Sequence, residues 1–234
     1  MRSIAKLMKD WQFTGPDGVT TAVELPHTWN ARDGQDGGND YWRGCCTYCT
    51  RFAAPVYDPA QQQVWLQFEG VNASATVLLN GQQLCTHDGG YSTFRAEVTE
   101  LLQAENQLTV RVDNSVNDRV YPQKADFTFY GGIYRDVSLL VVNKNHIALG
   151  HFGDTGVKIT PALQENSADI QVETLVEGAG RVAVELLDAE GRTVAKGEGE
   201  NAFLHLDAPH LWNGVKDPYL YTCVVRLLQD GQPV

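Results

Sequence analysis

The chain has 234 residues, of which 18 are basic and 29 acidic, so its formal net charge is −11. With 43% hydrophobic and only 20% charged residues, it has enough apolar side chains to bury a core, which excludes a disordered chain. The acidic excess disfavours nucleic acids and anionic membranes, because both bind through a basic surface. The longest apolar run, Leu139–Val142, is too short to cross a bilayer.

The first ten residues carry scattered charges and lack the uninterrupted apolar core of a signal peptide, so we expect a cytoplasmic protein. Five cysteines are an odd number for a disulfide framework. Cys45, Cys46 and Cys49 lie close together, but a structural zinc site needs four ligands, usually in two pairs, and no second pair follows. We therefore expect these cysteines to lie on a half-buried strand and predict no metal or other cofactor.

Hydrophobic residues alternate with polar ones along most of the chain, which predicts strands with one face on a core. The short Thr99–Gln103 segment instead predicts one turn of helix between strands. In chain order, the expected strands are 64–68, 75–79, 82–85, 108–112, 137–142, 170–176, 182–186 and 219–227.

Turn residues separate these strands. Asn80-Gly81 stands between two of them and predicts a hairpin with a type I′ turn, because both central residues of that turn need positive φ. Glu190-Gly191 and Asp230-Gly231 predict further turns. Short antiparallel strands at this spacing indicate an all-β protein built from sandwiches.

A polar trio, residues 143–145, follows the strand expected over 137–142, and a new set of alternating segments then begins. The sequence therefore predicts a first β domain over 1–144 and a smaller one over 145–234. The second has the size and turn spacing of an immunoglobulin-like sandwich. The chain stops at Val234 directly after a turn signal, which suggests a cut between elements.

Two loop-like stretches combine polar groups with aromatic rings. Residues 25–44 are rich in Gly, Asp and Asn, and residues 121–137 place Asp126 ahead of four aromatic residues and a Gly-Gly pair. Carboxylates, amides and rings together suit a sugar, whose hydroxyls need acceptors and whose C–H face packs on aromatics. The alternative is that the rings belong to the core and the polar residues form turns, and composition by itself favours this alternative.

An ordered series of segments along the whole chain resembles the N-terminal half of glycoside hydrolase family 2 enzymes, the β-galactosidases, β-glucuronidases and β-mannosidases. The most specific is 126–137, with its Gly-Gly-Ile-Tyr-Arg-Asp-Val core. The others are residues 7–13, 25–30, 41–44, 77–81, 89–94 and 108–114.

This resemblance implies that 1–144 is a jelly-roll, galactose-binding-like domain and 145–234 an immunoglobulin-like domain. In the family, a third domain, a (β/α)₈ barrel, carries both catalytic glutamates, and hydrolysis proceeds with retention. No acid of this chain matches either glutamate motif, so we assign no catalytic residue. The implied partners are a terminal β-glycoside and the chain's own barrel, and a homo-oligomer is possible.

The resemblance also places substrate contacts in the first domain. Asp126 matches the position of the family's acid that reaches sugar hydroxyls, and Asn39 or Asp40 would supply a second polar contact. Trp29 and Trp42 could stack on a sugar, but we expect them instead to be buried support under the loop. Arg135 and Asp136 are expected to pair with each other. The strand after Gly44 departs from the family pattern, because cysteines occupy positions that often hold an aromatic and a basic residue.

The leading hypothesis is a non-catalytic portion of a β-galactosidase-like hydrolase, with the galactoside preference resting on the loop Asp36–Tyr41. One alternative is a free-standing carbohydrate-binding module or lectin, since jelly-roll sandwiches often have this role. Another is a purely structural tandem of sandwiches.

Overall fold

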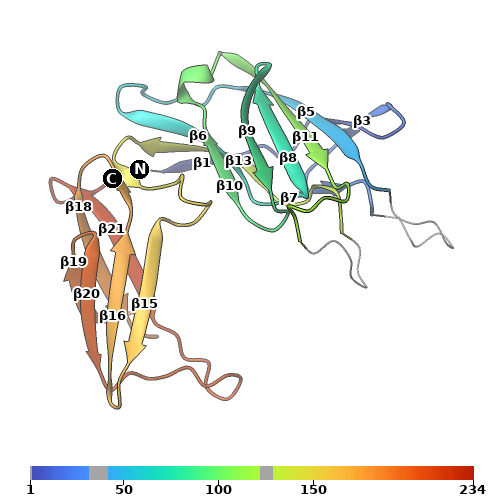
Figure 1. Cartoon of the computed structure of the whole chain (residues 1–234). Helices are drawn as coiled ribbons and strands as arrows, with labels where there is room; N and C mark the ends of the chain where they lie inside the picture. Colours follow the sequence, from blue (N-terminus) through green and yellow to red (C-terminus); the bar gives the residue numbers. More distant parts are fainter. Residues whose placement is uncertain (1, 32–41, 122–128) are drawn as a thin grey trace. The chain divides into compact units, whose positions relative to one another are not determined.

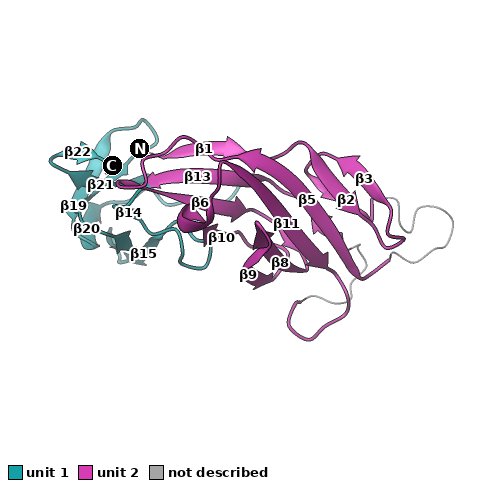
Figure 2. Cartoon of the chain, turned by 90° about the horizontal axis from the view of Figure 1, so that it is seen from above, with its two compact units in different colours: residues 1, 143–234 teal, residues 2–142 magenta. Residues whose placement is uncertain are grey.

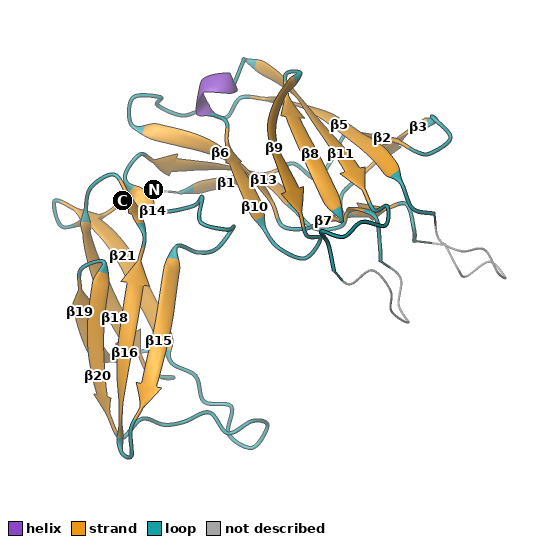
Figure 3. Ribbon diagram, viewed as in Figure 1, coloured by secondary structure: helices purple, strands orange, loops and turns teal. Residues whose placement is uncertain are grey.

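The structure, a computed structural model, describes residues 2–31, 42–121 and 129–234. The chain divides into two compact units, residues 2–142 and 143–234 (Figure 2). This division lies two residues before the boundary expected from the sequence. Among the described residues the structure is all-β, as predicted, apart from the single 3₁₀ turn η1 (Thr99–Leu101), which lies where a helical turn was expected (Figure 3). None of the described helical residues forms a segment long and apolar enough to span a membrane.

The first unit is built from antiparallel sheets (Figure 1). The larger has the strand order β3 (Thr20–Val23), β2 (Trp11–Thr14), β5 (Cys45–Ala53), β11 (Glu105–Asp113), β8 (Ser74–Leu79) and β9 (Gln82–Asp88). A four-stranded sheet has the order β1 (Ser3–Lys6), β13 (Val137–Asn143), β6 (Gln62–Phe68) and β10 (Phe94–Glu97). A small sheet joins β4 (His27–Thr28), β12 (Gly132–Ile133) and β7 (Val71–Asn72).

Alternating residues of these strands form one apolar core. Tyr48 of β5, Leu66 of β6, Val77 of β8 and Val110 of β11 are all fully buried and belong to the same cluster. The hairpin between β8 and β9 has φ of 52° at Asn80 and 84° at Gly81, which confirms the turn predicted from that pair. Cys45, Cys46 and Cys49 lie on β5, as expected, and all five cysteines of the chain are unpaired.

The second unit is a smaller sandwich with its own core, which includes Val172, Val184 and Leu204. One sheet has the order β15 (Val157–Leu163), β16 (Ser167–Thr174) and β20 (Asn201–Asp207). The other has the order β19 (Thr193–Glu198), β18 (Arg181–Leu187), β21 (Thr222–Gln229) and β22 (Gln232–Pro233). A short pair joins β14 (His146–Ile147) and β17 (Val176–Glu177).

The strand expected over 219–227 begins later than its alternation suggested. β21 starts at Thr222, so Tyr219 and Tyr221 precede it. Their hydroxyls accept hydrogen bonds from the backbone N–H groups of Ala189 and His210, at 3.2 and 2.9 Å. These two tyrosines therefore brace loops and lie outside the sheet.

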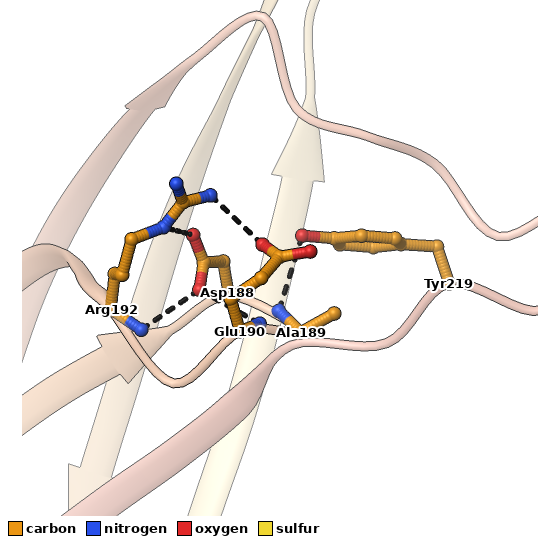
Figure 4. Close-up of polar contacts among 5 residues, drawn as sticks. All are labelled: Asp188, Ala189, Glu190, Arg192 and Tyr219. Carbon is orange, nitrogen blue, oxygen red and sulfur yellow. Dashed lines mark hydrogen bonds and ion pairs between the residues drawn. The ribbon is translucent and has the colours of Figure 1, made fainter.

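The turn between β18 and β19 is organised by the buried carboxylate of Asp188 (Figure 4). It accepts hydrogen bonds from the backbone N–H groups of Glu190 and Arg192, at 3.1 and 2.8 Å, and from the Arg192 guanidinium at 2.7 Å. Burial raises the pKa of Asp188, but the hydrogen bonds from Arg192 outweigh it, so the pKa lies below its ordinary value. The charged form of this side chain is therefore favoured by folding.

We expect the stability contributed by Asp188 to be lost in acid. Because its pKa is lowered in the folded unit, the contribution is complete above the unfolded pKa of about 3.9 and declines as the pH falls through the lower folded value. Asp188→Asn should therefore destabilise the second unit at pH 7 and do so less at pH 3. Urea unfolding, with Trp212 reporting on this unit, measures the difference. Asp230→Asn, in the exposed turn before β22, is the matched control, and an equal effect of Asp188→Asn at both pH values would contradict the account.

Candidate functional site

The three residues predicted to contact substrate, Asn39, Asp40 and Asp126, lie outside the described residues. What the structure does describe are the chain segments on either side of them. Asn39 and Asp40 lie in sequence between Ala31 and Trp42, and Asp126 lies between Tyr121 and Phe129. The site is therefore described from the residues that flank positions 32–41 and 122–128 in the sequence.

The anchor is the side chain of Asn30, which is 1% exposed. Its Oδ1 accepts hydrogen bonds from the backbone N–H of Gly131 at 2.7 Å and from Nδ2 of Asn114 at 3.2 Å. Its Nδ2 donates to the carbonyl of Trp42 at 2.9 Å. One buried amide thus joins the chain before residue 32, the chain after residue 41 and the chain after residue 128.

Asn114 extends this connection to the sheet. It directly follows β11, and it is 4% exposed. Its Oδ1 accepts a hydrogen bond from the N–H of Gly44 at 2.8 Å, and its own N–H donates to the Gly44 carbonyl at 3.2 Å. The amide pair Asn30–Asn114 therefore fixes the segment at residue 42 to the adjacent ends of β5 and β11, which are part of the rigid sheet.

The Gly131-Gly132 pair allows this close approach. A Cβ at Gly131 would overlap the indole of Trp29 and crowd Nδ2 of Asn114. Gly132 has φ of 137° and lies against the backbone of β4. The hydroxyl of Thr28 donates to the Gly131 carbonyl at 2.7 Å. The glycines in the segment that most resembles the hydrolase family are thus explained by packing.

Aromatic rings support the same region. Trp29 stacks on Phe13 with ring centroids 6.0 Å apart and meets Trp42 edge-on, also at 6.0 Å. The Arg43 guanidinium lies 5.6 Å from the centre of the Phe129 ring. These ring contacts agree with a supporting role for Trp29, whereas Trp42 is 37% exposed and is therefore not the buried support that was expected.

Two open grooves border β4. One, of about 590 Å³, is lined by residues that include Phe13, Asp17, Trp29 and Ala31, and thus reaches the residue that precedes position 32. The other, of about 300 Å³, is lined by Pro26, Tyr130 and Tyr134. His27 and Thr28 line both.

His27 is held in a fixed orientation. Its Nδ1 lies 2.7 Å from the hydroxyl of the buried Tyr48. Burial lowers the pKa of His27 and raises the pKa of Tyr48, so both side chains are neutral near pH 7. The neutral imidazole can donate or accept a hydrogen bond at Nε2, whereas the Thr28 hydroxyl, whose hydrogen is donated to the Gly131 carbonyl, can only accept one from a polar ligand.

The expected Arg135–Asp136 pair is not the arrangement in the structure. Asp136 forms an ion pair with Lys6, while Arg135 lies over the Tyr134 ring, 5.5 Å from its centre, and reaches the backbone carbonyls of Glu69 and Tyr91. Neighbouring residues on an extended chain point in opposite directions, which explains why each finds a different partner. Both residues are thus structural.

The described residues around β4 offer hydrogen-bonding groups to a polar ligand. Retaining hydrolysis needs two carboxylates about 5–5.5 Å apart. Among the described residues that line the two grooves, one has a carboxylate side chain, and it is Asp17. In the same described part of the chain, no cluster of His, Cys, Asp and Glu side chains could hold a metal ion.

Comparison with known proteins places this arrangement in a family. Residues 38–162, more than half of the chain, match the glycosyl hydrolase 2 galactose-binding domain-like family, and residues 151–234 match glycosyl hydrolases family 2. The chain belongs to glycosyl hydrolase family 2. The resemblance seen in the sequence is thereby confirmed, including a galactose-binding-like domain followed by the family's second sandwich.

Among its relatives, a β-glucuronidase of Bacteroides fragilis is 32% identical over 97% of the chain. An FMN-binding β-glucuronidase from Facaelibacterium prausnitzii L2-6 has a structure that matches the whole chain with a TM-score of 0.91 and 34% identity. A putative β-galactosidase from Bacteroides fragilis matches 99% of it with a TM-score of 0.89 and 35% identity. The chain spans only 36%, 38% and 39% of the lengths of these three proteins.

Sequence reasoning missed Asn30 and Asn114 as organising residues of this family 2 domain. Their sequence signal was weak, because an asparagine at the end of a strand or before a Gly-rich stretch is a common turn residue. Only the three-dimensional contacts bring together two side chains that are 84 positions apart.

We expect Asn30→Ala to destabilise the first unit by at least about 2 kcal/mol, because it leaves a buried N–H, an amide and a carbonyl without this partner. Urea unfolding followed by tryptophan fluorescence measures the change. Asn201→Ala, at an exposed position of β20, is the matched control and should alter stability by less than about 0.5 kcal/mol. Equal effects of the two variants would refute the anchoring role of Asn30.

Proposed function

We propose that this chain is the accessory N-terminal portion of a retaining β-glycoside hydrolase, and that the catalytic carboxylates lie in a (β/α)₈ barrel in the rest of the enzyme. The observation that carries the proposal is the match of nearly the whole chain to proteins named as β-glucuronidases and a putative β-galactosidase, of which it spans less than two fifths. The described grooves, which offer hydrogen-bonding groups without a carboxylate pair, support an accessory role.

Within this proposal, Asp126 reaches hydroxyls of the bound sugar, and Asn39 or Asp40 adds a second polar contact. The support is the common anchor of the two segments: Asn30 bonds both to Trp42, which follows the first, and to Gly131, which follows the second. A carboxylate that accepts two sugar hydroxyls would orient the ring before the bond is cleaved.

The substrate we propose is a terminal β-glycoside, with a β-glucuronide as the first to test. Two of the three similar proteins are named β-glucuronidases, and the third is named a putative β-galactosidase. The loop 36–41 had suggested a β-galactoside, which remains the second substrate to test. Comparing hydrolysis of nitrophenyl β-glucuronide and nitrophenyl β-galactoside by the full-length enzyme decides between them.

Asp126→Ala in the full-length enzyme should lower kcat/KM by about 30- to 1,000-fold, equivalent to about 2–4 kcal/mol of lost transition-state binding. Thermal unfolding should change little. Asp118→Ala, at an exposed acid of the same unit, is the matched control and should leave kcat/KM near the wild-type value. Unaltered kinetics of Asp126→Ala would instead support a purely structural tandem of sandwiches.

The 234-residue chain by itself should not hydrolyse either substrate, and it should bind glucuronic acid or galactose only feebly, because the sugar contacts from the rest of the enzyme would be missing. Chromogenic assays and calorimetric titration of the purified chain test both statements. Reproducible hydrolysis would contradict the proposed position of the catalytic groups. Tight binding would favour the alternative, a free-standing carbohydrate-binding module.

A further inference from the structure

The second unit leaves part of its inner face uncovered. β15 is the edge strand of its sheet and pairs with β16 (Figure 1). Ile159, Pro161 and Leu163 stand directly opposite Val172, Ile170 and Ala168 of β16, which belong to the buried core. Residues directly opposite each other point to the same face of a sheet, so these three apolar side chains face the core side. Ile159 is nevertheless 46% exposed and Leu163 61% exposed.

The segment 208–221, between β20 and β21, forms the opposite wall. Leu211 is 52%, Trp212 64% and Leu220 70% exposed. Both walls line one groove of about 440 Å³, whose floor reaches the core residues Ala168, Ile170 and Leu186. We name this surface the open-edge groove; it is defined by Ile159, Pro161, Leu163, Leu211, Trp212 and Leu220.

Polar contacts hold the wall segment in this position. The Nε2–H of His210 donates a hydrogen bond to the Asp217 carboxylate at 2.7 Å, and the His210 ring stacks on Tyr219 with centroids 4.0 Å apart. The Tyr219 hydroxyl accepts the N–H of Ala189, next to the Asp188 turn (Figure 4). The apolar side chains are thus presented outward by a braced segment.

We propose that the open-edge groove is the docking surface for the polypeptide that completes the longer enzyme, an inference that rests on the proposed function. Apolar surface left in water is unfavourable, and extended exposed apolar surfaces usually mark interaction sites. Leucine, isoleucine, proline and tryptophan side chains suit a permanent contact, because permanent interfaces are more hydrophobic than transient ones.

The length of the relatives identifies the occupant. More than three fifths of the length of the similar proteins has no counterpart in this chain. A covalently continuous domain is present at high effective concentration, so it can cover such a groove in every molecule without high affinity of its own. A second copy of the chain is the competing occupant, and the experiment below distinguishes the two.

Hydroxyl-radical footprinting with mass spectrometry measures the exposure of these side chains in the 234-residue chain and in the full-length enzyme. Oxidation of Leu211 and Trp212 should fall severalfold in the full-length enzyme. Phe203, which is 70% exposed and does not line the groove, is the matched control and should be oxidised equally in both. Equal oxidation of Leu211 and Trp212 in the two proteins would overturn the proposal.

Cross-linking identifies what provides the protection. Full-length enzyme assembled from mixed ¹⁴N- and ¹⁵N-labelled copies is cross-linked at amines, with Lys216 as the reporter in the wall segment. Links from Lys216 to peptides beyond residue 234 within one isotope label support the proposal. Links that join the two labels, or protection of the 234-residue chain that grows with its concentration, would show a second copy in the groove and overturn it. Neither readout uses a substrate, so this result and the hydrolysis assays can fail independently.

Discussion

The first unit depends on one buried side chain to hold three of its described segments together. Asn30 has a single amide group, yet its carbonyl oxygen and its NH₂ connect Gly131, Asn114 and Trp42. A buried amide is costly unless its hydrogen bonds are made, so the three segments are specified together or not at all. The same constraint explains the Gly131-Gly132 pair, because a side chain at Gly131 would push Trp29 and Asn114 apart.

The second unit shows a comparable division between a polar brace and an apolar surface. The Asp188 turn and the His210–Tyr219 stack fix the chain around residues 208–221, and the side chains left exposed there include Leu211, Trp212 and Leu220. Polar contacts thus fix the conformation of this segment, while its apolar side chains form the surface that we propose as a docking site. In the first unit the arrangement is reversed, with an apolar sandwich supporting polar groups around β4.

Much of the fold could be predicted from the sequence, because strand alternation and Asn-Gly turns are local signals. The hairpin at Asn80-Gly81 and the helical turn at 99–101 are examples. Errors arose where side chains choose distant partners. Tyr219 and Tyr221 alternate like strand residues but hydrogen-bond across loops, and Asp136 pairs with Lys6 rather than with Arg135. Asn30 and Asn114 could not have been found, since nothing local indicates their contact. The family, in contrast, could be recognised, because many short segments matched in order.

The central claim is that these sandwiches assist a reaction carried out in another part of a longer enzyme, with the first unit contributing to sugar binding. A crystal structure of the full-length enzyme with a hydrolysis-resistant thio-linked β-glycoside tests it most directly. The account predicts that a carboxylate oxygen of Asp126 lies within about 3.2 Å of a sugar hydroxyl, and that both carboxylates flanking the scissile bond come from beyond residue 234. A sugar bound without contact to the first unit, or cleaved between carboxylates of this chain, would contradict it.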